Sequence, residues 1–189
     1  ETRMLTESRV EAKRNVLALR AALDADGDLL GTAIPRVYIV KTGTYMAEDV
    51  SADPDDEVDI MARIAKANQD QGAEDASRPR LHGFIMEGYS PYGVGTMSQM
   101  AALEVASYSG LVVVRVGRSD PGGMVPPAPI GATVNGSNLD ANKARLLLMA
   151  CLLRFGRPPR ARDSRNPTNE ERQAVAAKIS EFQEVFSTH

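Results

Sequence analysis

The side chains best suited to chemistry in this sequence are hydroxyl and guanidinium groups that follow two predicted strands. Tyr89, Ser90 and Tyr92 lie in a loop that contains glycines and a proline, before a predicted helix. Their hydroxyl groups can donate hydrogen bonds to a carboxylate, helped by the positive end of that helix. Arg118 follows a second strand-like run, at the edge where open α/β sheets bind ligands, and a guanidinium fork suits a carboxylate. These four residues predict a binding site for a small molecule that carries a carboxylate.

Each of these groups also has a purely structural interpretation. The tyrosine-containing segment can be a surface loop without a ligand. Arg115 and Arg118 can form a salt bridge that packs one domain on another. His82 opens a strand and has no obvious partner, which favours a capping or surface role over catalysis. At the two arginines and at the loop, the sequence leaves the choice between ligand binding and packing open.

Composition disfavours several other classes of site. Two histidines and one cysteine offer almost no material for a zinc site, and we expect neither a metal nor a cofactor. The acidic run at residues 48–57 lacks the spacing of a calcium loop, which needs a central glycine and a closing glutamate. The arginines between residues 154 and 165 have no interleaved aromatic side chains for stacking on bases. With a net charge of −3, there is no whole-molecule electrostatic case for binding nucleic acid or membrane.

The composition suits one domain, or one domain with a small appendage. The chain has 189 residues, of which 43% are hydrophobic, and this is enough for a real core. No apolar run approaches the ~20 residues that span a bilayer, and the first residues lack a secretory pattern. Cys151 lies on an apolar helix, where we expect a buried structural thiol. A cytoplasmic location is the default expectation.

Hydrophobic patterning predicts the elements that position the candidate residues. Residues 81–86 and 111–116 are compact apolar runs, and the second suits a central parallel strand buried on both faces. Residues 132–134 form a short β-type run before a helix whose N-cap is expected at Asn138 or Ser137. From residue 81 the order is strand, helix, strand, long loop, strand, helix. This alternation predicts an α/β fold with a layered parallel sheet flanked by helices.

Two of the expected helices have a clear inward face. One follows the tyrosine-containing loop, and a capping box at Thr168 and Glu171 predicts the start of the last. The side chains expected to face the core are Met97, Met100, Ala101, Val105 and Tyr108 in the first of these helices, and Val175, Ile179, Phe182 and Val185 in the second.

The beginning of the chain has a different pattern. Residues 7–23 are amphipathic and typical of a helix, and residues 37–46 predict a β-hairpin. The acidic, proline-containing residues 48–59 predict a solvated linker, and residues 58–69 predict a short helix. We therefore divide the chain into residues 1–50, a helix and hairpin, and residues 51–189, an α/β domain.

Two segments resemble a known family. Residues 113–123, VVRVGRSDPGG, and residues 136–152, GSNLDANKARLLLMACL, resemble the carboxy-terminal domain of the bacterial-type L-asparaginase/glutaminase family, which has a V-V-R-S-S-R strand end and a K-A-R-x-L-L helix. Arg115 and Arg118 fall on the two arginines of the first motif. The end of the chain is similar to the family's terminal helix. Residues 1–50 are more loosely similar to the last helix and hairpin of its amino-terminal domain. The resemblance implies an asparaginase carboxy-terminal-domain-like fold.

The family's catalytic motifs have no counterpart that can be placed here. The resemblance implies a nucleophilic threonine in a T-G-G-T segment and a second threonine in H-G-T-D. Thr42, Thr44 and Thr96 lie in segments that superficially resemble these motifs, but β-propensity in a hairpin explains the first two equally well. The family's G-x-G-N-G-N loop reaches a neighbouring subunit's site. It corresponds here to residues 88–93, which contain no asparagine.

Three functional hypotheses follow from this resemblance. The first is an amidohydrolase component that acts on L-asparagine or a related small amino-acid amide together with a separate chain carrying the catalytic threonines. The second is a catalytically silent asparaginase-like module that binds a small amino acid or a protein partner through the tyrosine-containing loop. The third is hydrolase activity of this chain alone. We expect a homo- or hetero-oligomer, and neither a nucleic acid nor a membrane as partner.

Overall fold

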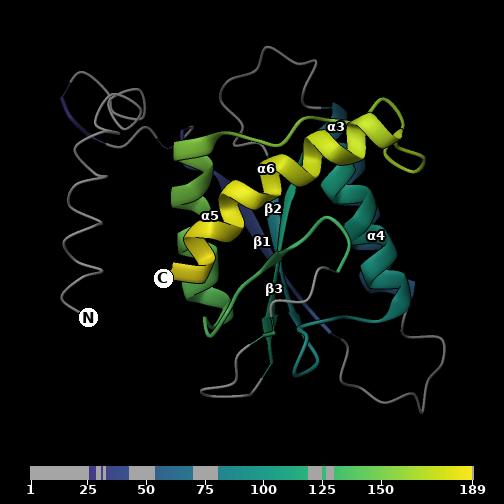
Figure 1. Ribbon diagram of the computed structural model, residues 1–189, viewed down its shortest axis with the longest axis horizontal. Helices are drawn as coiled ribbons and strands as arrows, with labels where there is room; N and C mark the ends of the chain where they lie inside the picture. Colours follow the sequence, from purple (N-terminus) through teal and green to yellow (C-terminus); the bar gives the residue numbers. More distant parts are fainter. Residues whose placement is uncertain are drawn as a thin grey trace.

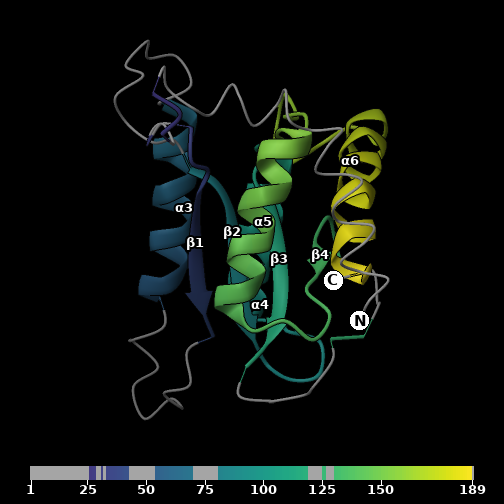
Figure 2. The same cartoon turned by 90° about the vertical axis from the view of Figure 1, so that its left-hand side faces the viewer.

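The strands form at short runs rich in valine and isoleucine, and they pair in parallel. In the computed structural model the described strands are β1 (Arg36–Lys41), β2 (Leu81–Gly88), β3 (Val112–Gly117) and β4 (Val134–Asn135). They lie side by side in the order of the sequence, β1-β2-β3-β4, in a sheet that Figure 1 shows along its edge and Figure 2 shows from one face. The structure describes residues 26–28, 31, 33–42, 54–69, 81–118, 125–126 and 130–188, with the backbone alone for residues 54–59.

Helices cover both faces of this sheet. α3 (Pro54–Gln69) and α4 (Met97–Tyr108) lie on one face, and α5 (Ala141–Phe155) lies on the other. Figure 2 shows α5 in front of the strands and α4 behind them. α6 (Asn169–Thr188) packs against α5 and against β4. The predicted α/β fold with a layered parallel sheet flanked by helices is therefore confirmed.

Alternating side chains of the strands form two separate cores. Because both faces are covered, β3 is apolar at consecutive positions, as predicted for a central parallel strand. One core lies under α5 and α6 and includes Ile85, Val114, Leu148 and Phe182; the other lies under α3 and α4 and includes Ile64, Phe84, Leu103 and Val113.

The helix α5 begins later than expected. Its N-cap is Asp140, whose Oδ1 accepts a hydrogen bond from the Lys143 N–H at 2.8 Å. The prediction of Asn138 or Ser137 as N-cap is therefore wrong. The reason is a turn before the helix, where Asn135 Oδ1 accepts from the Ser137 N–H and Ser137 has a φ of 56°. A residue in this left-handed region belongs to a turn, whereas an N-cap has extended backbone angles.

The cysteine of α5 is a buried structural thiol, as expected. Cys151 is buried in the core under α5 and α6. Burial raises the pKa of the Cys151 thiol to about 11. The thiol is therefore protonated at neutral pH, and a protonated thiol is a poor nucleophile.

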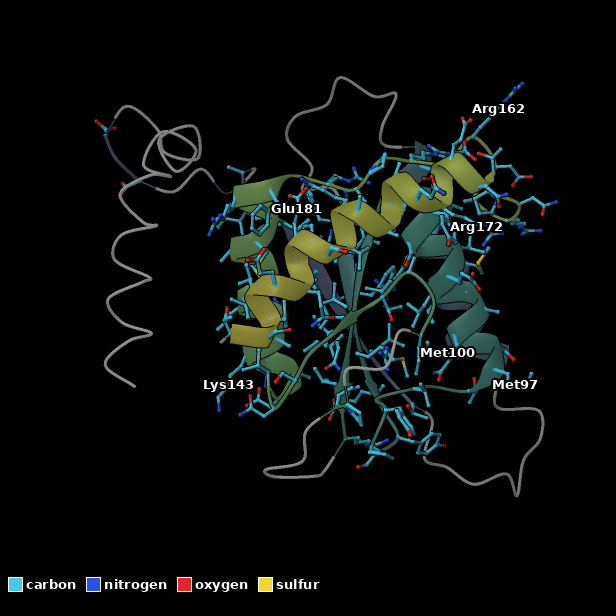
Figure 3. The ribbon with its side chains drawn as sticks, in the orientation of Figure 1. Met97, Met100, Lys143, Arg162, Arg172 and Glu181 are labelled. Carbon is cyan, nitrogen blue, oxygen red and sulfur yellow. The ribbon has the colours of Figure 1, made fainter. Side chains whose placement is uncertain are left out.

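The face that α4 turns to the core differs from the predicted one. Met97 is 91% exposed, at the lower end of α4 in Figure 3, and Ala101 is exposed. In their place Gln99, Ala102 and Leu103 are buried. The difference arises because the polar Gln99 occupies an interior position, where its side chain bonds the end of β1. The other expected residues are partly or fully buried, as predicted: Met100, Val105 and Tyr108.

The capping box predicted at the start of α6 is present. The Thr168 N–H donates to Glu171 Oε2 at 2.8 Å, and the Glu171 N–H donates to Thr168 Oγ1 at 3.3 Å. The side chains expected to face the core are buried or partly buried there: Val175, Ile179, Phe182 and Val185. Neither α6 nor any other helix in the described part of the chain is long and apolar enough to cross a membrane.

The region before residue 60 agrees with the sequence pattern in part. β1 forms at the first strand of the predicted hairpin and pairs in parallel with β2, as far as Lys41 beside Glu87. The second hairpin strand, near residue 45, and the predicted helix at residues 7–23 lie outside the described residues. The predicted linker is wrong from residue 54 onward, because α3 already begins at Pro54, a residue type suited to the first turn of a helix. The division at residue 50 stays a prediction.

Candidate functional site

Three strands end side by side, and hydrogen bonds tie their ends together. The Thr42 N–H, just after β1, donates to Glu87 O at 3.0 Å. Arg118, just after β3, donates from its backbone N–H to Gly88 O at 2.8 Å and from Nη1 to Thr42 O at 2.7 Å. We call this end of the sheet the carboxyl edge, and it is the lower end in Figure 2. Open parallel sheets usually hold their ligands at this edge.

The loop after β2 folds back over the end of β3. We call residues 89–94 the tyrosine loop. The Tyr89 N–H donates to Val94 O at 2.7 Å, and the Gly93 N–H donates to Tyr89 O at 2.8 Å. Gly93 has a φ of 63°, and a Cβ there would lie 2.8 Å from the backbone oxygen of Val116. This close approach means that the tyrosine loop rests directly on β3. Glycine alone fits such a position without strain.

The residues predicted to bind a ligand through their hydroxyl groups are exposed on this loop. Tyr89 is 44% exposed, Tyr92 is 45% exposed, and Ser90 is exposed as well. Arg118 is half-buried, and its backbone bond to Gly88 places it at the start of the loop. A guanidinium has five N–H donors, and the bond to Thr42 uses one of them. The structure thus brings the four predicted site residues to the same edge of the sheet.

A buried arginine on β3 donates a hydrogen bond to the tyrosine loop. Arg115 on β3 is fully buried, and burial lowers the pKa of its guanidinium from the ordinary value. Its Nη1 donates to Tyr92 O, and its Nε donates to Thr133 Oγ1 at 2.9 Å. Thr133 Oγ1 donates in turn to Ile130 O at 2.5 Å. These bonds reach neutral oxygens and join the tyrosine loop to the segment before β4.

The helix after the loop is fixed to β1 by a residue that the apolar pattern did not single out. Thr96 and Gln99 form a reciprocal capping box, in which the Thr96 N–H donates to Gln99 Oε1 at 3.0 Å and the Gln99 N–H donates to Thr96 Oγ1 at 3.2 Å. Gln99 Nε2 also donates to Lys41 O at 3.2 Å. The spacing T-x-x-Q is a known capping signature and would have revealed the first pair of bonds. The positive end of α4 is thereby held next to the tyrosine loop.

The threonines considered as nucleophiles have structural roles where they are described. Thr42 is 1% exposed, and its Oγ1 donates to Glu87 O at 3.2 Å. The Thr96 hydroxyl caps α4, and Thr44 lies outside the described residues. A nucleophilic hydroxyl needs a base within hydrogen-bond reach and room for the substrate. Thr42 is closed to a substrate, so its surroundings disfavour Thr42 as a nucleophile.

Histidine has a structural role at the other end of the strands. His82 Nδ1 accepts a hydrogen bond from the Arg36 N–H at 3.2 Å, which is the kind of role expected for it. The residues described here contain no group of three or more His, Cys, Asp and Glu side chains that could hold a metal ion. At the carboxyl edge, Lys41 Nζ lies 3.8 Å from Glu87 Oε2. These two opposite charges offset each other, so the groups at this edge that suit an anion are the hydroxyls of the tyrosine loop and the Arg118 guanidinium.

The detectable similarity of this chain to known proteins is structural. A scan against protein families finds no match, and a search of curated proteins finds none. Among solved structures, the chain is similar to a probable cytoplasmic L-asparaginase from Campylobacter jejuni, with 19% sequence identity and a TM-score of 0.49. The similarity covers 82% of this chain and 35% of that chain, so this chain corresponds to a minor part of that protein's length.

Proposed function

We propose that this chain is the amino-acid-binding component of an asparaginase-like amidohydrolase, and that a separate chain carries the catalytic threonines. The observation that supports this proposal is the meeting of two sequence features at the carboxyl edge. Arg118 lies in a segment that resembles the asparaginase strand motif, and its backbone N–H bonds Gly88, the residue before the tyrosine loop. The sequence resemblance implies that residues 88–93, which include most of this loop, correspond to the family loop that reaches a neighbouring active site.

The chemistry divides naturally between two chains. Hydrolysis of a side-chain amide needs a hydroxyl nucleophile, a base beside it, and donors that stabilise the oxyanion. At the described part of the carboxyl edge, the Thr42 and Thr96 hydroxyls are engaged in structural hydrogen bonds. We therefore assign the binding of the substrate to this chain and the nucleophile to its partner.

In this proposal the tyrosine loop binds the carboxylate of L-asparagine or a related small amino-acid amide. The hydroxyl groups of Tyr89, Ser90 and Tyr92 donate to it, and a hydrogen bond to a charged group contributes about 1.5–3 kcal/mol. Arg118 and the amino-terminal end of α4 add positive potential at the same edge. Because the backbone under these side chains is held by hydrogen bonds, little ordering is needed on binding.

The second candidate is a catalytically silent asparaginase-like module that binds a small amino acid or a protein partner. The engaged hydroxyls of Thr42 and Thr96 favour it, because they leave a binding surface without an evident nucleophile in the described residues. Exposed large side chains at the same edge, Tyr89, Tyr92 and Met97, also suit a protein partner, since aromatic residues and methionine are enriched at interfaces.

Binding of L-aspartate, the product of L-asparagine hydrolysis, tests the amino-acid site. We expect its addition to the ¹⁵N-labelled chain to shift the amide resonances of the tyrosine loop and of Arg118. Tyr92→Phe removes one hydroxyl and is expected to weaken binding about tenfold. Tyr108→Phe is the matched control, because Tyr108 is buried at the other end of α4. Resonances of the loop that stay unshifted by L-aspartate would remove the amino-acid site.

Ammonia release from L-asparagine tests the division between two chains. We expect none from this chain alone. Co-purification followed by mass spectrometry is expected to identify a chain with a T-G-G-T segment, and the two purified chains together are expected to release ammonia. Turnover by this chain alone would overturn the two-chain proposal. Binding of L-aspartate without such a partner would favour the silent module.

A further inference from the structure

A charged side chain is buried against the sheet, next to the tyrosine loop. Arg115 is fully buried on β3, where its register partners are Met86 of β2 and Asn135 of β4. Burying an arginine is unfavourable unless hydrogen bonds satisfy its N–H groups. A long apolar side chain would fill the same space without that requirement. The guanidinium therefore has a role that an apolar side chain could not fill. Its hydrogen bonds to Tyr92 O and Thr133 Oγ1 show which two segments it holds.

The bond to Tyr92 fixes the middle of the tyrosine loop. Backbone hydrogen bonds hold the two ends of the loop together, between Tyr89 and Val94. Arg115 holds the carbonyl group of Tyr92 between these ends, immediately before Gly93 with its φ of 63°. Because the carbonyl and the side chain belong to the same residue, fixing one limits the directions open to the other. The position of the Tyr92 hydroxyl therefore depends on the bond from Arg115.

We infer that Arg115 is a positioning residue, which holds the tyrosine loop in one conformation without touching the molecule that the loop binds. What the loop binds rests on the proposed function, whereas its conformation can be measured without a ligand. The planar guanidinium is essential, because Nε and Nη1 point in fixed directions toward Thr133 and Tyr92. A lysine ammonium is a single point of charge and cannot hold both partners in the same geometry.

Fluorine NMR of the intact chain tests the conformational role. The chain has five tyrosines and no tryptophan, so labelling with 3-fluorotyrosine gives a small set of resonances that Tyr→Phe variants assign. In Arg115→Lys we expect the Tyr89 and Tyr92 resonances to shift and broaden. The matched control is Arg157→Lys, because Arg157 Nε donates to Gly110 O at 3.0 Å at the opposite end of the sheet. That variant is expected to leave both loop resonances unchanged.

Binding of L-aspartate gives a second readout. Arg115→Lys is expected to weaken it about tenfold and Arg157→Lys to leave it unchanged. If the unmodified chain does not bind L-aspartate, the proposed function fails, while the loop resonances still decide the role of Arg115.

A folded Arg115→Lys variant with unchanged Tyr89 and Tyr92 resonances overturns the inference. If Arg115→Lys does not fold, Thr133→Val takes its place, since it removes the acceptor of Arg115 Nε at nearly constant size. A smaller shift of the same two resonances is then expected. Their constancy in Thr133→Val would also overturn the inference.

Discussion

The two ends of the sheet use the same kind of bond, an arginine side chain that donates to a backbone carbonyl. At the carboxyl edge, Arg118 joins the ends of β1, β2 and β3, and Arg115 reaches the tyrosine loop from inside the sheet. At the other end, which we call the amino edge, Arg157 donates to Gly110 O. There the bond holds the connection between α5 and α6 on the turn after α4. Arg115 and Arg118 thus support a loop with exposed tyrosine and serine residues, whereas Arg157 holds two connecting segments together.

The aromatic side chains at the two ends differ in the same way. Tyr89 and Tyr92 are exposed at the carboxyl edge. At the amino edge, Tyr108 is buried and the Arg172 guanidinium lies 5.4 Å from the centroid of its ring. Figure 3 places Arg172 above Met97, toward the other end of α4. Exposed hydroxyl groups on a backbone held by hydrogen bonds suit a binding site, so the proposed site lies at the carboxyl edge, whereas the aromatic side chain at the amino edge is part of the packing.

Leu148→Asp is expected to have the largest effect, because it removes the core on which both ends depend. Leu148 lies on the inner face of α5 and is fully buried, and an unpaired buried carboxylate costs several kcal/mol against a total stability of ~5–15 kcal/mol. We expect no cooperative thermal transition by circular dichroism. The matched control is Leu146→Asp, two positions away and 66% exposed, which should change stability by less than about 0.5 kcal/mol. A cooperatively melting Leu148→Asp variant would contradict the placement of α5.

Alanine at two glycines with positive φ separates the ends directly. Gly93→Ala at the carboxyl edge combines a φ of 63° with a Cβ 2.8 Å from the backbone oxygen of Val116. Gly156→Ala at the amino edge has a φ of 71° and a ψ of −168°, and nothing lies within 4 Å of the added atom. We expect backbone strain of roughly 1–3 kcal/mol for the second and a larger loss for the first, where a steric clash adds to the strain, from urea unfolding. Equal losses would mean that the tyrosine loop does not rest on β3.

Tyr92→Ala is expected to change binding without changing the fold. The side chain is 45% exposed, so the free energy of unfolding should change by about 0.5 kcal/mol or less. L-aspartate binding should weaken more than about tenfold. Met97→Ala is the control at the same edge, because Met97 is 91% exposed and has no hydroxyl. If Met97→Ala alone weakens binding of a protein partner, a protein-binding surface is favoured over the amino-acid site.

The fold could be predicted from the sequence where its signals are local. The apolar run of β3 and the capping box at Thr168 and Glu171 depend on neighbouring residues, and both are present. The start of α5 was missed, because several good capping residues follow one another and the turn at Ser137 decides among them. The buried face of α4 was missed because Gln99 is buried by a bond to Lys41, far away in the sequence.

The candidate site could be predicted in part for the same reason. Tyr89, Tyr92 and Arg118 follow strands, and parallel strands end at one edge, so their meeting follows from the topology. The role of Arg115 does not follow in this way. The apolar run around it predicts that Arg115 is buried on β3, but its partner Tyr92 O lies in the loop after β2. Hydrogen bonds between a side chain and a distant backbone carbonyl leave no periodic pattern in the sequence.

The smallest expected difference between the two ends concerns two carboxylates at helix starts. Asp140 lies at the start of α5 near the carboxyl edge, and Glu171 lies in the first turn of α6 at the amino edge. The backbone hydrogen bond from Lys143 is the main cause that lowers the pKa of Asp140. Backbone hydrogen bonds from Arg162 and then Thr168 lower the pKa of Glu171.

A carboxylate with a lower pKa in the folded state than in the unfolded state stabilises the fold above the unfolded pKa, about 4. That contribution is lost as the pH falls through the folded pKa. We therefore expect the difference in urea midpoint between the unmodified chain and Asp140→Asn or Glu171→Gln to be largest near neutral pH, to shrink as the pH falls below the unfolded pKa, and to vanish below the folded pKa. Glu171→Gln should show the larger difference, because Glu171 accepts from the backbone of the α5–α6 connection as well as from its own cap. A larger difference for Asp140→Asn would mean that the carboxyl edge depends more on its helix-capping carboxylate than the amino edge does.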